Sequence, residues 1–155
     1  MQDPKLFLVD DSTGDGILLD LAFTESGRSV KIVQAHDGVE AFELLRAAAG
    51  QRPFPFRLIV IDLHLPRMDG LELLLGLKGW PELSRVPMVI LTTASTVLER
   101  ERIENCHSAL LMKPNDYSGL AVIVAELAAY MCTCEQPMQK CRWLANQRIA
   151  LPIPA

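Results

Sequence analysis

Short apolar runs that alternate with helix-like stretches are the feature that most restricts how this chain can fold. The five runs cover residues 6–9, 30–33, 58–61, 88–91 and 109–112. Continuous apolar runs of this length are typical of strands in a parallel sheet, because helices cover such a sheet on both faces. The sequence therefore predicts an α/β fold.

Stretches with apolar residues at helical spacing follow each run. They cover residues 15–26, 38–49, 71–78, 96–105 and 118–132, and the first three are followed by a glycine that favours a helix end. The fourth stretch is highly charged, so we expect it to be partly exposed. Strands that alternate with helices are joined by right-handed crossovers, which predicts a doubly wound five-stranded parallel sheet with helices on both faces.

The composition fits one globular domain, since 50% of the 155 residues are hydrophobic and 22% are charged. We assign this domain to residues 1–132. Residues 133–155 break the strand–helix pattern because three prolines punctuate them. We expect a C-terminal tail there, with at most a short helix at 138–149, and no output domain.

Charge and hydropathy exclude several classes of function. The formal net charge is −4 and there is no cluster of Lys and Arg, so nucleic acid is not an expected partner. No apolar run reaches the roughly 18 residues of a membrane helix. The first residues do not resemble a secretion signal, and four cysteines do not suggest a disulfide scaffold. We therefore expect a cytoplasmic protein that does not interact with membranes.

Polar side chains with useful chemistry follow four of the five apolar runs. In an open parallel sheet, ligands bind beyond the carboxyl ends of the strands, so we expect these side chains to meet there. The second run is followed only by Gln34, which fits a strand at the edge of the sheet. The residues at the other four ends are Asp10, Asp11, Asp62, Thr92 and Lys113.

Three carboxylates that converge on one point repel one another, so they need a cation or raised pKa values. An all-oxygen set of this kind suits Mg²⁺. With a lysine and a hydroxyl nearby, the cluster becomes a site for a phosphoryl group. One carboxylate can then act as the nucleophile and form an acyl phosphate.

Four motifs, in this order, resemble the receiver domain of bacterial two-component response regulators, and the likeness covers about residues 4–132. The segment Leu-Pro-Arg-Met-Asp-Gly at 65–70, together with Leu-Thr-Thr, is more similar to the single-domain regulators that partner bacterial phytochromes. The resemblance to this chemotaxis-regulator-like family implies the flavodoxin-like strand order 2-1-3-4-5. The motifs are Leu8-Val9-Asp10-Asp11, the segment 61–70, Leu91-Thr92-Thr93 and Met112-Lys113-Pro114.

The resemblance also implies how the acidic residues would work. Asp62 would accept a phosphoryl group from a phosphohistidine on a sensor histidine kinase. Asp11, Asp62 and the backbone carbonyl of His64 would ligate Mg²⁺ directly. Asp10 would act through a water molecule bound to the metal.

The remaining matching residues would bind the phosphoryl group and carry the switch. Lys113 would pair with the phosphoryl group. Thr92 would move toward it and bias the surface between two states. The bond between Lys113 and Pro114 would be cis.

The sequence departs from the family pattern at three places. Leu110 stands where the family usually has the aromatic residue whose rotation is part of the switch. Cys106-His107 replaces a common Gly-Ala pair, and the segment 94–105 is a residue shorter than in the phytochrome-partner type. We therefore expect a reshaped fourth helix and fifth strand.

Simpler interpretations exist for each feature alone. An Asp-Asp pair after a strand often only caps a helix, and Asp62 could be a solvated turn residue. A zinc site from Cys106, His107, Cys132, Cys134 and Cys141 is disfavoured, because structural zinc usually has paired ligands two to four residues apart. The set of residues as a whole favours the receiver.

We thus expect a stand-alone response regulator that is not an enzyme. It would signal by protein contact through its fourth helix, fifth strand and fifth helix. A homodimer is one form that this contact could take. Its own chemistry would be limited to self-phosphorylation from small donors and loss of that group. One alternative is a pseudo-receiver that binds partners without phosphorylation. The other is a phosphatase with an aspartate nucleophile. Such enzymes commonly carry a second Asp two residues after the nucleophile, and His64 at that position disfavours this alternative.

Overall fold

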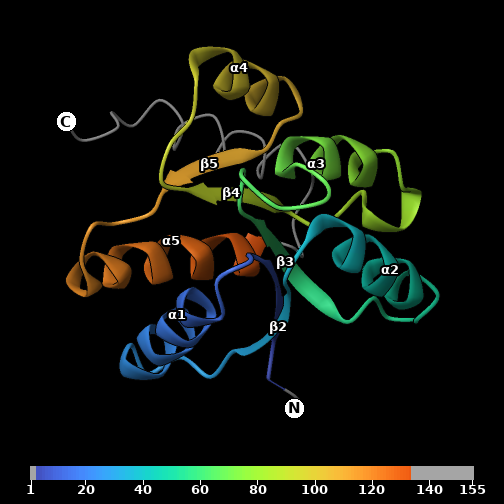
Figure 1. Ribbon diagram of the computed structural model, residues 1–155. Helices are drawn as coiled ribbons and strands as arrows, with labels where there is room; N and C mark the ends of the chain where they lie inside the picture. The colour runs from blue at the N-terminus through green and yellow to red at the C-terminus, as the bar shows by residue number, and fades with distance from the viewer. Residues whose placement is uncertain (1–2, 134–155) are drawn as a thin grey trace.

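The computed structural model describes residues 3–133 of the chain and contains one five-stranded parallel sheet (Figure 1). The strand order is β2-β1-β3-β4-β5, so β2 and β5 are the edge strands. This confirms the doubly wound architecture and the edge position expected for the second strand. The strands are β1 (Lys5–Val9), β2 (Lys31–Ala35), β3 (Phe56–Ile61), β4 (Met88–Thr92) and β5 (Ala109–Met112).

Helices cover both faces of the sheet, as expected. α1 and α5 pack side by side on one face, and α2, α3 and α4 cover the other (Figure 1). The last helix begins two residues later than predicted, because a 3-10 turn, η2, precedes it. The helices are α1 (Thr13–Glu25), α2 (Gly38–Ala49), α3 (Gly70–Lys78), α4 (Val97–Asn105) and α5 (Leu120–Thr133), with 3-10 turns η1 (Pro81–Leu83) and η2 (Tyr117–Gly119).

The apolar strands supply two core layers, because successive side chains of a strand point to opposite faces. In β1, Leu6 and Leu8 pack with α1 and α5, whereas Phe7 and Val9 pack with α2, α3 and α4. All four side chains are buried. Burial on both faces explains why the runs are continuously apolar rather than alternating.

Polar residues fix where three of the helices begin. The Ser12 hydroxyl accepts a hydrogen bond from the backbone N–H of Asp15, and Asp37 caps α2 in the same way through Glu40. Thr96 and Glu99 form a capping box at the start of α4. Side-chain caps of this type satisfy backbone donors that have no partner within the helix. The Ser12 cap starts α1 close to the end of β1.

The turn between α4 and β5 is built around His107, and the reshaping of these elements relative to the family stays a prediction. α4 ends at Asn105, and His107 adopts a left-handed backbone conformation with φ of 58°. The N–H of Ser108 donates to the carbonyl of Ile103 and the N–H of His107 donates to that of Glu104. This pattern of two bonds is a Schellman motif, which usually employs glycine at the left-handed position.

Two further predictions concern membrane-spanning helices and the C-terminal tail. Within residues 3–133, no helix is both long and apolar enough to cross a bilayer. The predicted tail at 133–155, with its short helix at 138–149, falls outside the described residues except for the backbone of Thr133.

Gly70 has a backbone constraint that yields a stability prediction. A Cβ atom at Gly70 would overlap the backbone of Asp62 and Leu63, whereas one at Gly76 in the same helix would meet only the Phe42 ring, at 3.8 Å. We expect Gly70→Ala to lower the free energy of unfolding by about 2 kcal/mol or more, since the backbone of the loop cannot yield cheaply. Gly76→Ala should raise it by about 0.5–1 kcal/mol through helix propensity. Urea unfolding measures both, and equal effects would contradict the close approach.

Candidate functional site

The parallel hydrogen-bond pattern continues past the strand ends and aligns the predicted site residues. The N–H of Asp10 donates to the carbonyl of Ala35 at 3.0 Å, and the N–H of Asp62 donates to that of Val9 at 2.8 Å. The N–H of Lys113 likewise donates to the carbonyl of Thr92 at 2.7 Å. Each residue is therefore held in register with its neighbouring strand, at the side of the sheet where the carboxyl ends of the strands lie.

Asp10, Asp11 and Asp62 form an acidic group at this edge. One carboxylate oxygen from each lies within 4.8 Å of the others. Asp10 and Asp62 are buried and Asp11 is exposed, so the group has a wall within the protein and one side open to solvent. Three carboxylate oxygens at this spacing fit a hard divalent cation such as Mg²⁺, which binds oxygen ligands and retains water molecules.

The Lys113 ammonium contacts two carboxylates of this acidic group. Its Nζ lies 2.7 Å from Asp10 Oδ2 and 3.3 Å from Asp62 Oδ2. A third carboxylate oxygen, from Asp15, lies 2.9 Å from the same nitrogen. Burial alone would lower the pKa of Lys113, but the hydrogen bonds to Asp10 and Asp15 outweigh it and hold that pKa above its usual range.

Asp10 is the most enclosed of the acidic residues, with 2% of its surface exposed. Burial raises the pKa of its carboxyl group, and the hydrogen bonds from Lys113 and from the N–H of Ser12 offset this only in part. Without a metal ion, keeping this carboxyl group charged therefore costs free energy in the folded protein. A cation bound at the group would relieve it.

Two residues of the site escaped the sequence analysis. Asp15 was expected only as part of a helix, yet its position in the first turn of α1 brings it to Lys113. Gln34 was assigned to an edge strand, yet its amide donates to the backbone carbonyls of Asp10 and Ser12 at 2.8 and 3.0 Å. The signal for Asp15 was its place one turn after the Asp-Asp pair. Nothing in the sequence pattern pointed to the amide of Gln34.

Thr92 is fully buried, and the hydrogen bond of its hydroxyl goes to a neighbouring loop rather than to Asp62. It donates to the backbone carbonyl of Ala94 at 3.3 Å. The His64 ring places Nε2 3.1 Å from the same carbonyl oxygen, which can only accept, so the ring is the donor. His64 thus has a contact that the sequence analysis did not assign, between the loops that follow β3 and β4.

Leu110 and Pro114 are the other two positions singled out in the sequence. Leu110 packs in the core layer beneath α2, α3 and α4, and 7% of it is exposed. The expectation of a cis bond between Lys113 and Pro114 is wrong, since that bond is trans and the cis bond in the described residues joins Arg52 and Pro53. The trans form is intrinsically favoured by about 0.5–1 kcal/mol before proline. Pro114 also packs closely on Gly119, whose lack of a side chain leaves room for the ring in this conformation.

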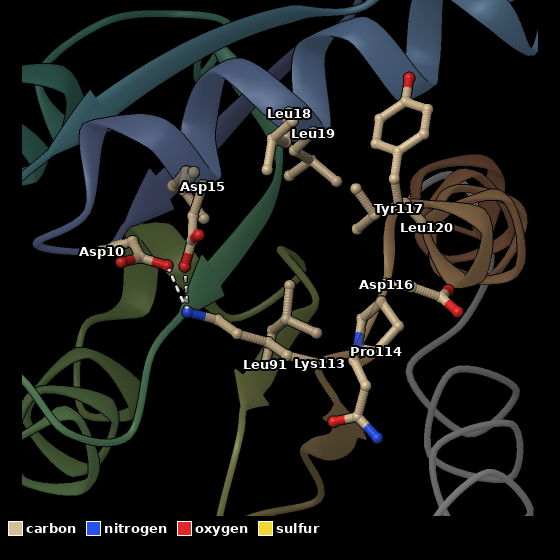
Figure 2. A pocket seen from close by; sticks show the side chains of 12 residues that line it. Asp10, Asp15, Leu18, Leu19, Leu91, Lys113, Pro114, Asp116, Tyr117 and Leu120 are labelled. Atoms are coloured by element: carbon tan, nitrogen blue, oxygen red, sulfur yellow. Dashed lines mark hydrogen bonds and ion pairs between the residues drawn. The ribbon is translucent and has the colours of Figure 1, made fainter.

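A cavity of about 270 Å³ adjoins the acidic group between α1 and the start of α5 (Figure 2). Asp10, Asp15 and Lys113 form one polar part of its lining. Leucine side chains and the segment from Pro114 to Tyr117 form the rest. The Tyr117 hydroxyl donates to Glu25 at 2.8 Å, which joins the segment before α5 to the end of α1.

The disfavoured zinc site has no counterpart in the described residues. There, the one gathering of three or more metal-ligating side chains is the acidic group of Asp10, Asp11 and Asp62. Cys106 and Cys132 are free thiols. Cys134 and Cys141 lie outside the part of the chain that the structure describes.

The raised pKa of Asp10 predicts a pH dependence of stability. Above the ordinary value of 3.8, the unfolded chain loses the proton of Asp10 while the folded chain retains it. The folded state then binds more protons, so its stability falls as pH rises through this window. Asp10→Asn lacks this group, so without metal the unfolding free energy of the wild type should drop relative to the variant as pH rises from 3.8 upward. Urea unfolding over a pH series measures the difference, and an opposite slope would contradict the assignment.

Comparison with known proteins identifies relatives along most of the chain. The probable methanogenesis regulatory protein FilR2 from Methanothrix harundinacea (strain 6Ac) is 33% identical over 132 residues, which are 83% of this chain and 84% of that protein. The phosphorylated form of the cyanobacterial phytochrome response regulator RcpA superimposes with a TM-score of 0.73. It is 30% identical, over 85% of this chain and 96% of RcpA.

A second solved structure is the Mn²⁺-bound form of the response regulator Rcp1, with a TM-score of 0.67 and 29% identity over 78% of this chain and 88% of Rcp1. The family model for the response regulator receiver domain matches residues 6–125. These residues include β2 to β5, all of β1 except its first residue, and the first part of α5. The chain therefore belongs to the response regulator receiver domain family of two-component signalling.

Proposed function

We propose that this protein accepts a phosphoryl group on Asp62 from a phosphohistidine of a sensor histidine kinase. The observation that carries the proposal is the position of the Asp62 carboxylate, in contact with the Lys113 ammonium at 3.3 Å and within the acidic group. A carboxylate in such a place can be both nucleophile and metal ligand. Membership of the receiver family supports the same role.

The transfer would use few groups of the protein. A carboxylate oxygen of Asp62 attacks the phosphorus, the P–N bond to the kinase imidazole breaks, and its electron pair returns to the ring nitrogen. The product is an aspartyl phosphate with its charge spread over the phosphoryl oxygens. Lys113 binds one of these oxygens, and Thr92 donates to another after leaving the carbonyl of Ala94. Positioning and charge stabilisation account for most of the catalysis of such a step.

Asp10, Asp11 and Asp62 are the side chains that would hold Mg²⁺, together with the backbone carbonyl of His64. Their all-oxygen donor set and the spacing within 4.8 Å support this. When bound, the ion would neutralise the acidic group and the incoming phosphoryl oxygens. The similar regulator Rcp1 has been solved in a form that binds Mn²⁺, a divalent cation with similar ligand preferences.

The proposed partner is a kinase of the phytochrome type, because RcpA is a phytochrome response regulator. Output by protein contact through α4, β5 and α5, with a homodimer as one form, remains a prediction. So do the stand-alone organisation and the cytoplasmic location. Val97 and Leu98, which are largely exposed at the start of α4, give this face apolar side chains for such a contact.

Phosphorylation by a small donor tests the acceptor directly. We expect wild-type protein with acetyl phosphate and Mg²⁺ to gain the mass of one phosphoryl group, and Asp62→Asn to gain none. Asp69→Asn is a matched control, since Asp69 lies in the same loop but its side chain makes no capping hydrogen bond. Intact mass spectrometry with and without EDTA measures the uptake. Equal uptake by wild type and Asp62→Asn would refute Asp62 as the acceptor.

Metal binding separates an active receiver from a pseudo-receiver. We expect millimolar Mg²⁺ to raise the unfolding temperature of the wild type by a few degrees, since a ligand that binds only the folded state stabilises it by RT ln(1 + [L]/Kd). Asp11→Asn, in the exposed part of the acidic group, should lose most of this increase. Scanning fluorimetry measures it. A wild type that does not respond to Mg²⁺ would favour the pseudo-receiver.

A further inference from the structure

Asp15 contacts Lys113 from outside the acidic group. Its carboxylate Oδ2 lies 2.9 Å from Lys113 Nζ, shorter than the 3.3 Å between that nitrogen and Asp62. It comes from the first turn of α1, whereas Asp10 and Asp62 come from strand ends. Figure 2 shows Asp10 and Asp15 converging on the lysine from the same side of the cavity.

The three contacts use all the donors that a lysine offers. An ammonium group has three N–H bonds and no acceptor, and Lys113 donates to Asp10, Asp15 and Asp62. Before the bond between Asp62 and phosphorus forms, Lys113 can bind an incoming phosphoryl oxygen only if it releases one of these carboxylates. Asp62 carries the phosphoryl group itself, and Asp10 belongs to the set that would hold the metal.

We infer that Asp15 is a positioning residue that restrains Lys113 in the resting protein and competes with the phosphoryl group for one of its N–H donors. The inference rests on the proposed function and deepens it. Asp15 keeps the lysine charge paired while no phosphoryl group is present. It thereby sets how readily Lys113 becomes available to an incoming phosphoryl group.

The surroundings allow this exchange of partners without repacking the core. Lys113 and Asp15 both line the cavity of about 270 Å³, so their side chains have open space beside them. Asp15 has 43% of its side chain exposed, while Lys113 has 14%. When the pair separates, Asp15 can therefore be solvated by water. Asp10, which is buried, cannot be released as cheaply.

The test compares rates of phosphoryl uptake from acetyl phosphate at saturating Mg²⁺. We expect Asp15→Asn to be phosphorylated about three- to tenfold faster than wild type, because a partly exposed ion pair no longer has to be broken. Asp15→Glu keeps the charge and should restore a rate near that of wild type. Asp20→Asn is the matched control, since Asp20 is exposed on the same helix and is not among the carboxylates that contact Lys113. Its rate should stay within about twofold of wild type.

A second measurement does not depend on phosphorylation. Urea midpoints of wild type, Asp15→Asn, Lys113→Gln and the double variant, all without metal, form a double-mutant cycle that isolates the contact. We expect the two single shifts to be non-additive. Additive shifts would overturn the inference, because the lysine would then not be restrained by Asp15.

The two measurements also separate this inference from the proposed function. If the wild type is phosphorylated and Asp15→Asn is no faster than Asp20→Asn, the role of Asp15 is wrong and the acceptor function stands. If the wild type takes up no phosphoryl group while the cycle shows coupling, the acceptor function is wrong. The role given to Asp15 is then wrong with it, and only an ion pair remains.

Discussion

The parallel register of the central strands is the constraint on which the site depends. The hydrogen bonds of Asp10, Asp62 and Lys113 to the neighbouring strands extend the sheet by one residue at its carboxyl edge. Residues that are about 50 positions apart in sequence are thereby placed side by side in space. The strands can keep this register because their continuously apolar sequences are buried on both faces. The close approach of Gly70 to the backbone of Asp62 and Leu63 restrains the loop that follows β3.

Charge balance at this edge is the second physical theme. A single ammonium group contacts three carboxylates, and Asp11 lies beside them without contacting it. The local charge is therefore negative in the resting protein, which favours a divalent cation. Under the proposed function, the oxygens of an incoming phosphoryl group would compete with the carboxylates for the positive charge of Lys113. In that proposal, the contacts of Lys113 with the carboxylates would set how readily it binds phosphoryl oxygens.

The family resemblance predicts that Leu110 alters the usual link between the site and the surface. This residue is held in the core layer beneath α2, α3 and α4, so no aromatic ring is present there to rotate. The carbonyl of Ala94 instead receives hydrogen bonds from both Thr92 and His64. A movement of Thr92 toward Asp62 would leave His64 as the partner of that carbonyl. The loop before α4 is thus the place where a change at Thr92 would first be felt.

The amino-acid pattern was enough to predict the fold class, the second strand as an edge strand, and the gathering of Asp10, Asp11, Asp62 and Lys113. It could do so because a buried parallel strand needs an apolar run, and because every such run ends at the same edge of the sheet. Three further features became visible only in the folded structure. They are the contact of Asp15 with Lys113, the hydrogen bonds from Gln34 to the loop after β1, and the trans bond before Pro114. The contact of Asp15 depends on how the first turn of α1 is placed against β5, and the hydrogen bonds of Gln34 depend on how β2 is placed against the end of β1. The trans bond was missed because the cis form was expected from the family resemblance, whereas the bond takes the intrinsically favoured trans form.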